Sequence, residues 1–321
     1  MACPPLTRPS RLLSRLAMAV VAAAVAASTP SLPGVAAQGA APRVGFTRAS
    51  GAFVGRDTGN AGGGRIINGR DVTENDRTLG AGFYTRLMYR SQGSVFFYCG
   101  GALIRPNKIL TAAHCIDGYD VTTAADFVRV GGIQMSSGFE LGISAAVIHP
   151  DYNRDTLDND LAVLTLRNPP SYGVMKRAGV RLAYTNGSGR RPVTGDTAYI
   201  PGHGDTSGTR PNTVSQTLQL ATAPINDWAA CTAYLERVGF TVGASPRTSL
   251  CASMADRQAT CFGDSGGPLF TRFTNRRGDT AYRVVGVVSH GYPNGPNQCP
   301  SRFPDYYART SWGFRWIRAQ L

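Results

Sequence analysis

The sequence has few histidines, no cluster of cysteines and histidines with metal-ligand spacing, and no apolar run long enough to cross a membrane. Only four of the 321 residues are histidines, and His114-Cys115 brings two metal-ligand types together without further ligands nearby. The longest apolar run, residues 16–27, has 12 residues, whereas a transmembrane helix needs about 20. We therefore expect a mature chain with no metal site, no cofactor and no membrane anchor.

Lysine is nearly absent, so arginine supplies the positive charge. The only lysines are Lys108 and Lys176, and the formal net charge of the chain is +13. Residues 1–65 hold seven of the 33 basic side chains and one of the 20 acidic ones, which leaves about +7 for residues 66–321. The basic residues do not cluster with aromatic ones in the manner of a nucleic-acid site. We expect a solvated basic surface and no nucleic-acid partner.

The N-terminal part has the pattern of a targeting segment followed by a linker. Three arginines precede the apolar run and small residues follow it, as in secretory signals. Residues 38–65 are rich in Gly, Ala and Arg and lack apolar periodicity, so they cannot bury enough surface to order themselves. We predict a signal peptide over residues 1–37, an activation pro-segment over 38–65 and a folded domain over 66–321.

The cysteines fit a protein exported to an oxidising compartment. Cys3 lies in the predicted signal peptide, and six others follow: Cys99, Cys115, Cys231, Cys251, Cys261 and Cys299. An even number of cysteines after a secretion signal favours disulfides, although spacing alone does not select the pairs. We expect a secreted, extracellular protein.

The strongest chemical signal is the stretch Cys-Phe-Gly-Asp-Ser-Gly-Gly-Pro-Leu-Phe at residues 261–270. Ser265 stands between glycines, which permit a sharp turn that presents its hydroxyl. Such a turn can also point the N–H groups of Gly263 and Ser265 at a developing oxyanion. Because a serine hydroxyl is a poor nucleophile without a base, this stretch predicts a histidine and an orienting acid elsewhere.

Two further motifs supply these partners. His114 ends an apolar, strand-like run beside Cys115, where a disulfide would hold it rigidly. Asp160 directly precedes an apolar run, and a half-buried carboxylate there suits an acid that orients an imidazole. Asp158 is the competing acid.

The junction between linker and domain reads Arg65-Ile66-Ile67-Asn68-Gly69. A basic residue followed by two β-branched residues suits cleavage after Arg65. The new α-amino group on Ile66 would be a cation, and Asp264 is the carboxylate predicted to bind it. Breaking such a buried pair costs about 3–5 kcal/mol, so the pair could hold the serine loop in its working shape only after cleavage.

The domain consists of short apolar runs separated by turn residues. Strand-like runs occur at residues 95–104, 127–130, 141–148, 161–166, 197–200, 215–221, 282–289 and 306–310, and residues 227–235 and 312–321 have helical spacing. Many short strands with turns between them are typical of β barrels and sandwiches. We predict an all-β domain with a short C-terminal helix.

These motifs resemble those of the trypsin/chymotrypsin family of secreted serine endopeptidases over essentially all of residues 66–321. The motifs Thr111-Ala112-Ala113-His114-Cys115, Asp160-Leu161-Ala162-Val163-Leu164 and Gly263-Asp264-Ser265-Gly266-Gly267-Pro268 occur in the family's order. The resemblance implies two six-stranded antiparallel β-barrels with the active site in the cleft between them.

The resemblance also implies the catalytic roles and the disulfides. His114 would be the general base, Asp160 its orienting acid and Ser265 the nucleophile, in the triad mechanism established for this family. The N–H groups of Gly263 and Ser265 would form the oxyanion hole. The implied disulfides are Cys99–Cys115, Cys231–Cys251 and Cys261–Cys299.

The sequence departs from the family pattern at the specificity pocket. Ala259 stands six residues before Ser265, where trypsin-like members carry an aspartate. Asp305 replaces a usual glycine on the far wall of the pocket, and Ser289 and Gly291 complete the predicted lining. We expect basic residues before the scissile bond, with a medium-sized apolar preference as the alternative.

Four other positions complete the comparison with the family. His203 and His290 stand where tryptophan is common, and His290 would line the cleft and alter subsite preference. His149 matches a structural position and is not a rival base. Asn186-Gly187-Ser188 is the one glycosylation sequon.

The sequence thus predicts a serine endopeptidase zymogen that works as a monomer on protein or peptide substrates and can be bound by protein protease inhibitors. The alternative from another class is a non-catalytic binding homologue. Such proteins usually lose a triad member or the activation site, and this sequence retains both.

Overall fold

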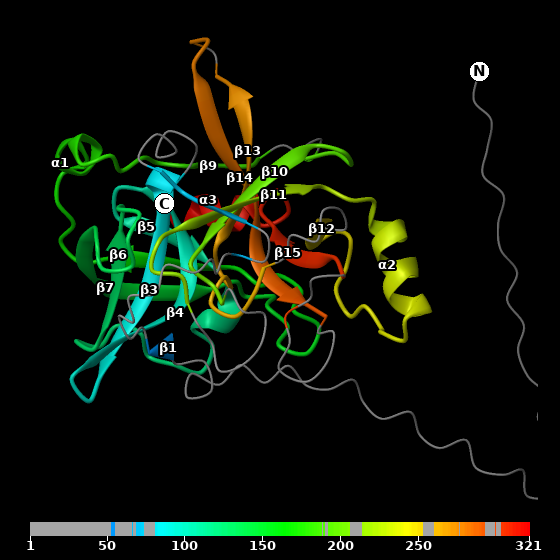
Figure 1. Ribbon diagram of the computed structural model, residues 1–321, viewed down its shortest axis with the longest axis horizontal. Helices are drawn as coiled ribbons and strands as arrows, with labels where there is room; N and C mark the ends of the chain where they lie inside the picture. The colour runs from blue at the N-terminus through cyan, green and yellow to red at the C-terminus, as the bar shows by residue number, and fades with distance from the viewer. Residues whose placement is uncertain are drawn as a thin grey trace, which may run out of the picture. The chain divides into compact units, whose positions relative to one another are not determined.

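A computed structural model describes residues 66, 69–73, 81–187, 189, 192–205, 214–252, 260–275, 277–292, 299 and 303–321, together with the backbone of residues 53–54. The predicted signal peptide, most of the predicted pro-segment, Arg65 and Ala259 lie outside these residues. The described chain is mostly β-structure, arranged as two sheets with a few short helices (Figure 1). The predicted all-β class is therefore confirmed.

The first sheet closes into a barrel. Its strands follow the order β1 (Phe53–Val54), β4 (Ser94–Arg105), β3 (Tyr84–Ser91), β6 (Asp126–Val130), β7 (Phe139–Ile148), β8 (Ala162–Leu166) and β5 (Lys108–Thr111). A further pairing of β4 with β5 joins the ends. Six strands therefore form a closed ring, and β1 lies outside it against β4.

The second sheet curls without closing fully. Its order is β12 (Ser249–Ala252), β15 (Asp305–Arg309), β14 (Thr280–Gly291), β13 (Pro268–Thr274), β10 (Thr197–Gly202), β11 (Gln219–Pro224) and β2 (Arg70–Asp71), and β9 (Tyr184–Thr185) pairs with β14. The ends approach at a single bridge between Ile225 and Ala252. Strand β2 pairs with Gln219 and Leu220 of β11, and no ladder joins β11 to β12 in the described residues. The second implied barrel is thus a half-barrel.

In the described residues, three short α-helices and two 3-10 helices accompany the sheets. They are α1 (Tyr172–Arg177), α2 (Trp228–Arg237), α3 (Phe314–Ala319), η2 (Ala81–Phe83) and η3 (Ala113–Cys115). Helix α2 begins at Asp227, whose side chain accepts the N–H of Ala230 at 3.0 Å, as an N-cap should. The two predicted helices are confirmed as α2 and α3, whereas α1 occurs in a connection for which no helix was predicted. No helix in the described residues is long and apolar enough to cross a bilayer.

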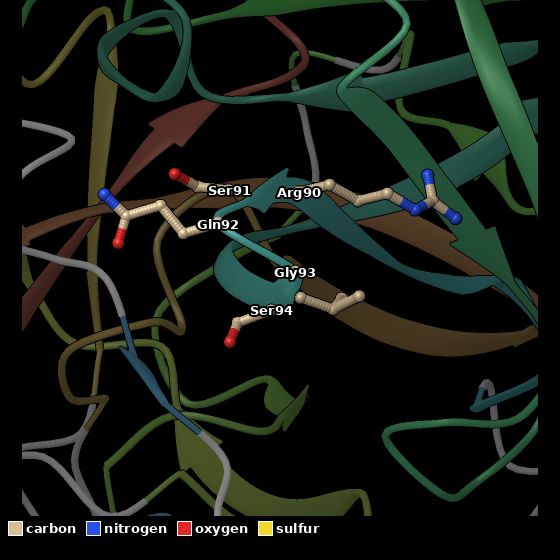
Figure 2. A pocket seen from close by; sticks show the side chains of 6 residues that line it. Arg90, Ser91, Gln92, Gly93 and Ser94 are labelled. Atoms are coloured by element: carbon tan, nitrogen blue, oxygen red, sulfur yellow. The ribbon is translucent and has the colours of Figure 1, made fainter.

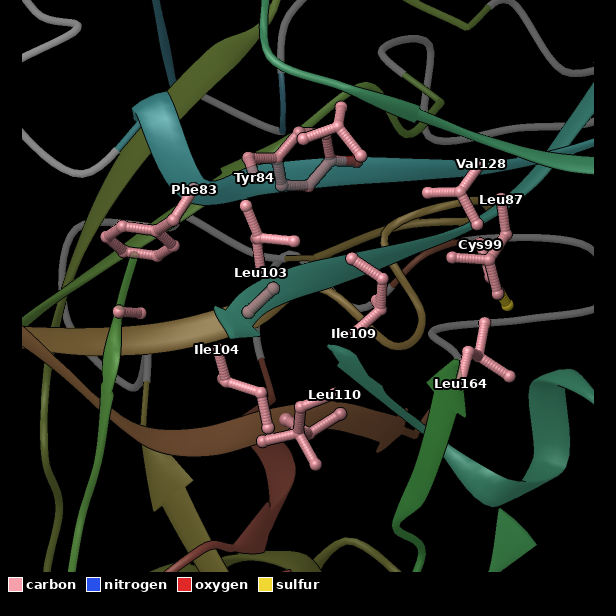
Figure 3. Close-up of a cluster of buried hydrophobic side chains, with 14 of the residues drawn as sticks. Phe83, Tyr84, Leu87, Cys99, Leu103, Ile104, Ile109, Leu110, Val128 and Leu164 are labelled. Carbon is pink, nitrogen blue, oxygen red and sulfur yellow. The ribbon is translucent and has the colours of Figure 1, made fainter. Parts of the chain in front are cut away.

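The main hydrophobic core continues from the first sheet into the second. Figure 3 shows its part in the first barrel, where Phe83, Leu103 and Leu164 are among the buried side chains. The same cluster includes Val284 and Val287 of β14. Burying a large aliphatic or aromatic side chain stabilises a fold by about 1.5–3 kcal/mol. The two sheets are therefore packed into one body, which can hold groups from both at fixed positions.

The β3–β4 hairpin shows how turn residues set local geometry. Gln92 and Gly93 have φ angles of 49° and 75°, as a two-residue hairpin turn of this kind requires. Figure 2 shows a hollow of about 270 Å³ at this tip, lined by residues 90–95, with Arg90 and Gln92 pointing in opposite directions. Because its side chains diverge, the hollow brings no reactive groups together.

Candidate active site

The chain turns sharply around Ser265. Gly263 and Gly266 have φ angles of 96° and 76°, in the left-handed region that favours glycine. A Cβ on Gly266 would lie 2.6 Å from the carbonyl oxygen of Gly100, so no side chain fits there. Gly100 in β4 donates its N–H to the Ser265 carbonyl at 2.7 Å. The loop is thus fixed against the first barrel, while Ser265 stays partly exposed.

The N–H groups of this loop fall into two sets. Those of Asp264, Gly266 and Gly267 donate to main-chain carbonyls. In the part of the chain that the structure describes, the N–H groups of Gly263 and Ser265 donate to no main-chain carbonyl. The two N–H groups expected to bind an oxyanion are thus the ones in this loop that make no main-chain hydrogen bond within the described residues.

His114 is held by the carboxylate of Asp160. His114 lies in η3, directly after β5, and its side chain is almost completely buried. Asp160 Oδ2 lies 2.7 Å from the ring Nδ1, and Oδ1 accepts the main-chain N–H of His114 at 2.9 Å. Burial raises the pKa of Asp160, but the charge of His114 and hydrogen bonds from His114 and Ser289 outweigh it and lower that pKa overall. The acid therefore stays ionised and fixes the ring orientation.

The competing acid, Asp158, has other partners. Its Oδ1 accepts the main-chain N–H of Ser245 at 3.0 Å and a hydrogen bond from the Thr248 hydroxyl. These partners lie in the segment that leads into β12, whereas Asp158 itself precedes β8. Asp158 thus links the two sheets, and Asp160 is the acid that contacts His114.

The serine loop packs beside His114. The disulfide Cys99–Cys115 joins β4 to the residue after His114, and a Cβ on Gly266 would lie 3.1 Å from Cys115 Sγ. Cys99, His114 and Cys115 also form the one group of three potential metal ligands among the described residues. Because both sulfurs are in the disulfide, this group offers no thiolate to a metal.

The second sheet supports the same centre from β14. The Ser289 hydroxyl donates to Asp160 Oδ2 at 2.6 Å. The neighbouring residue, Val288, accepts the N–H of Gly266 at 2.9 Å. One strand therefore contacts both the acid and the serine loop, so the three motifs that are far apart in sequence converge between the two sheets.

Asp264 is a buried carboxylate without a cationic partner among the described residues. It is fully buried and accepts the N–H groups of Gly204 at 2.8 Å and Cys261 at 3.0 Å. Burial raises its pKa to about 7. Gly202 lies between Asp264 and Ile66, since a Cβ there would meet Asp264 Oδ1 and lie 3.3 Å from Ile66 Cδ1. Ile66 is therefore already buried beside the acid predicted to bind its amino group.

Asp305 lies where strands β14 and β15 meet. Gly291 of β14 is its register partner, and its Oδ2 accepts the N–H of Thr260 at 2.7 Å. Burial raises the pKa of Asp305 to about 8. No ion pair between Asp305 and a lysine or arginine occurs in the described residues. The role of Thr260 was not foreseen, because the sequence gives no sign of which amide faces Asp305.

The family is shown by comparison with known proteins. A family model described as Trypsin matches residues 66–317. This chain belongs to the trypsin family. Trypsin theta of Drosophila erecta is 32% identical over 250 residues, which cover 78% of this chain and 85% of that protein. Human chymotrypsin-like elastase family member 1 is 34% identical over 244 residues, covering 72% and 84%. The trypsin of Sarcophaga bullata is 30% identical over 250 residues, covering 78% and 87%.

The trypsin-like domain contains the three disulfides that the resemblance implied: Cys99–Cys115, Cys231–Cys251 and Cys261–Cys299. The first holds the turn that carries His114. The second ties α2 to β12, and the third anchors the residue three positions before Asp264. Each disulfide restricts the unfolded chain and typically contributes about 2–4 kcal/mol.

The other histidines of this trypsin-family chain have distinct surroundings. His290 stacks on Tyr306 with ring centroids 5.1 Å apart, and its Nδ1 lies 3.2 Å from Ser289 Oγ. Burial lowers the pKa of His290 to about 4, so the ring is neutral at pH 7. His203 is fully buried with its Nδ1 2.8 Å from the Ser215 carbonyl, and burial lowers its pKa to about 3. His149 packs on Trp316, with ring centroids 4.8 Å apart.

Proposed function

We propose that this chain is the secreted zymogen of a serine endopeptidase, with a signal peptide over residues 1–37, a pro-segment over 38–65 and the protease domain over 66–321. The observation that carries the proposal is the double contact of Asp160 with His114 beside a loop that presents Ser265. Disulfides in a trypsin-like domain support export to an oxidising compartment. Its partners would be protein or peptide substrates and protein protease inhibitors, and it would act as a monomer.

In the proposed reaction, Ser265 Oγ attacks the scissile carbonyl carbon while His114 Nε2 takes the hydroxyl proton. Asp160 keeps the proton of the ring on Nδ1, so that Nε2 is unprotonated and can accept the hydroxyl proton. The N–H groups of Gly263 and Ser265 bind the oxyanion. The C–N bond then breaks as His114 gives its proton to the leaving amine. Water, deprotonated by His114, hydrolyses the acyl-enzyme and restores Ser265.

Activation by cleavage after Arg65 gives the buried Asp264 a partner. A carboxylate that is fully buried with a pKa of about 7 is partly protonated at neutral pH. The new ammonium group of Ile66 would ionise Asp264 and pair with it, because Ile66 already packs beside it. Asp264 adjoins both Gly263 and Ser265, so this pair would lock the oxyanion loop.

Asp305 supports a preference for arginine or lysine before the scissile bond. It is a buried acid beside Gly291, without an ion pair to a described residue, and a substrate cation would offset its burial. Such a preference would also permit self-activation at Arg65. The similar proteins include one named an elastase as well as trypsins, so a medium-sized apolar preference is the competing specificity. A panel of short substrates decides, since faster cleavage after Leu or Phe than after Arg would reject the basic preference.

Active-site titration tests the proposed activity. After cleavage following Arg65, a serine-phosphonylating reagent should label one site per chain. Ser265→Ala should abolish the labelling, whereas Ser144→Ala, which changes an exposed serine on β7, should leave it intact. A chain that starts at Ile66 and takes up no reagent would instead be a non-catalytic binding homologue.

A further inference from the structure

A strand from the pro-segment pairs with the catalytic domain. Strand β1, Phe53–Val54, lies antiparallel to β4 with Phe53 opposite Phe97 and Val54 opposite Phe96 (Figure 1). Both residues precede the proposed cleavage site at Arg65, so this pairing joins a segment that activation removes to a strand that it keeps.

Strand β4 has an open edge at this place. One edge of β4 pairs with β3, from Ser94 to Ala102. The other edge pairs with β5, but only from Ala102 to Arg105. Before Ala102, no strand of the closed barrel forms a ladder with the edge of β4 that faces away from β3 in the described residues, and β1 lies against part of it. Unpaired strand edges readily accept another extended segment.

This edge leads directly to the proposed catalytic centre. Along β4 from Phe97, Cys99 forms the disulfide to the neighbour of His114, and Gly100 donates its N–H to the Ser265 carbonyl. Three residues of strand span about 10 Å, so β1 lies within the length of a short peptide from Ser265. An extended segment bound here would compete with any extended substrate that follows the same edge of β4 away from Ser265.

The chain can hold β1 only while it is uncleaved. Val54 and Ile66 are 12 positions apart in the sequence. A tether of this length gives the strand an effective concentration on the order of millimolar. No disulfide would retain the segment after cleavage, because the six cysteines from Cys99 onward pair with one another. Two paired residues alone bind weakly.

We infer that Phe53–Val54 is an autoinhibitory strand, which covers the β4 edge beside Ser265 in the zymogen and leaves it after cleavage. The inference rests on the proposed function for its inhibitory part, since a chain without activity has nothing to inhibit. Its docking part stands on the β1–β4 pairing alone.

Hydrogen exchange tests the docking without requiring activity. In the full Ser265→Ala chain, which cannot process itself, the amides of residues 95–98 should exchange about tenfold more slowly than in the same chain with Phe53→Pro and Val54→Pro, as expected for one lost hydrogen bond. Val44→Pro in the same segment but outside β1 is the matched control and should retain the slow exchange. Equal exchange in all three chains would overturn the docking.

Inhibition is measured on the activated wild-type protein. A synthetic peptide of residues 46–58 should slow hydrolysis of an extended peptide substrate, and the peptide with Phe53→Pro and Val54→Pro should do so at least several-fold less well. Equal inhibition by both peptides, or none by either, would overturn the autoinhibitory role. If the activated wild-type protein is not labelled at Ser265 by the phosphonylating reagent, the proposed protease activity is rejected instead. The two failures are therefore distinguishable.

Discussion

Asp160 holds His114 at two points, with Oδ1 on its main-chain N–H and Oδ2 on its ring Nδ1. The first contact fixes the backbone of the turn, and the second fixes the ring and its tautomer. Replacing one carboxylate oxygen by an amide would therefore leave the turn in place but invert the hydrogen-bond demand at Nδ1. This separation of roles makes Asp160→Asn the most informative single substitution.

Asp160→Asn should lower kcat by about 10⁴-fold with little change in KM, because the imidazole is held in the wrong tautomer. Asp158→Asn is the matched control. It weakens the hydrogen bonds to Ser245 and Thr248, so it should lower the free energy of unfolding by about 1–3 kcal/mol and therefore the melting temperature. It should keep kcat within a few-fold of the wild-type value. Steady-state kinetics and thermal melts of both variants check this, and a larger kcat loss for Asp158→Asn would reverse the assignment.

Sequence motifs predicted the local parts of the site better than the long-range ones. The glycines around Ser265 and the apolar strand after Asp160 act over a few residues, so their pattern indicates a turn or a strand directly. Which acid meets His114 depends instead on how β5 and β8 pair, with Thr111 opposite Ala162. The sequence left Asp158 open for this reason. The contacts of Asp160 with His114, and those of Asp158 with Ser245 and Thr248, separate the two acids.

Two further features could not be predicted from local pattern. The sequence of residues 38–65 has too little apolar periodicity to predict β1, because that strand depends on an edge supplied by β4, about 40 residues later. In the second sheet, the ends meet only at the bridge between Ile225 and Ala252 in the described residues. Both results depend on pairing between strands far apart in the sequence, which composition does not encode.

The buried acid Asp305 predicts a pH-dependent specificity. With a pKa of about 8, it is neutral below that pH and anionic above it, so attraction for a substrate cation should grow as the pH rises. The ratio of kcat/KM for an Arg substrate to that for a Leu substrate should increase by about tenfold between pH 6 and pH 9. In Asp305→Asn the ratio should be flat, and a flat ratio in the wild type would remove Asp305 from the pocket.

Asp264 predicts a change in the pH dependence of stability on activation. Its folded pKa of about 7 lies above the ordinary value of 3.8, so the folded state binds a proton that the unfolded state has lost between these values. Stability of the uncleaved chain should therefore fall as the pH rises from about 4 to about 7. After cleavage, the Ile66 ammonium group would lower the pKa of Asp264, so the stability would no longer fall between these pH values. The test is the melting temperature of the Ser265→Ala chain across this pH range, before and after cleavage. The same slope of melting temperature against pH in both forms would contradict the pairing of Ile66 with Asp264.

The sequon at Asn186 should carry no glycan in the folded protein. The Asn186 side chain is 0% exposed, and a Cβ on Gly187 would lie 2.7 Å from the Phe314 ring, so the chain is tightly packed there. Intact mass of protein secreted from a glycosylating host should match the bare polypeptide, and Ser188→Ala, which removes the sequon, should change the mass only by the substituted oxygen atom. A glycan on folded, active protein would contradict the burial of Asn186.

Gly266 should be irreplaceable for two reasons that a control can separate. Its positive φ disfavours any side chain, and a Cβ would also collide with the Gly100 carbonyl and approach Cys115 Sγ.

The control is Gly278, which has a similar φ of 85° but has nothing within 4 Å of a Cβ. Gly278→Ala should therefore lower the stability by about 1–2 kcal/mol through backbone strain alone and leave Ser265 reactive. Gly266→Ala should cost more and slow the phosphonylation of Ser265 strongly, because the clash pushes the serine loop away from β4. Equal losses in melting temperature and in labelling rate for the two variants would mean that strain, and not packing against β4, positions Ser265.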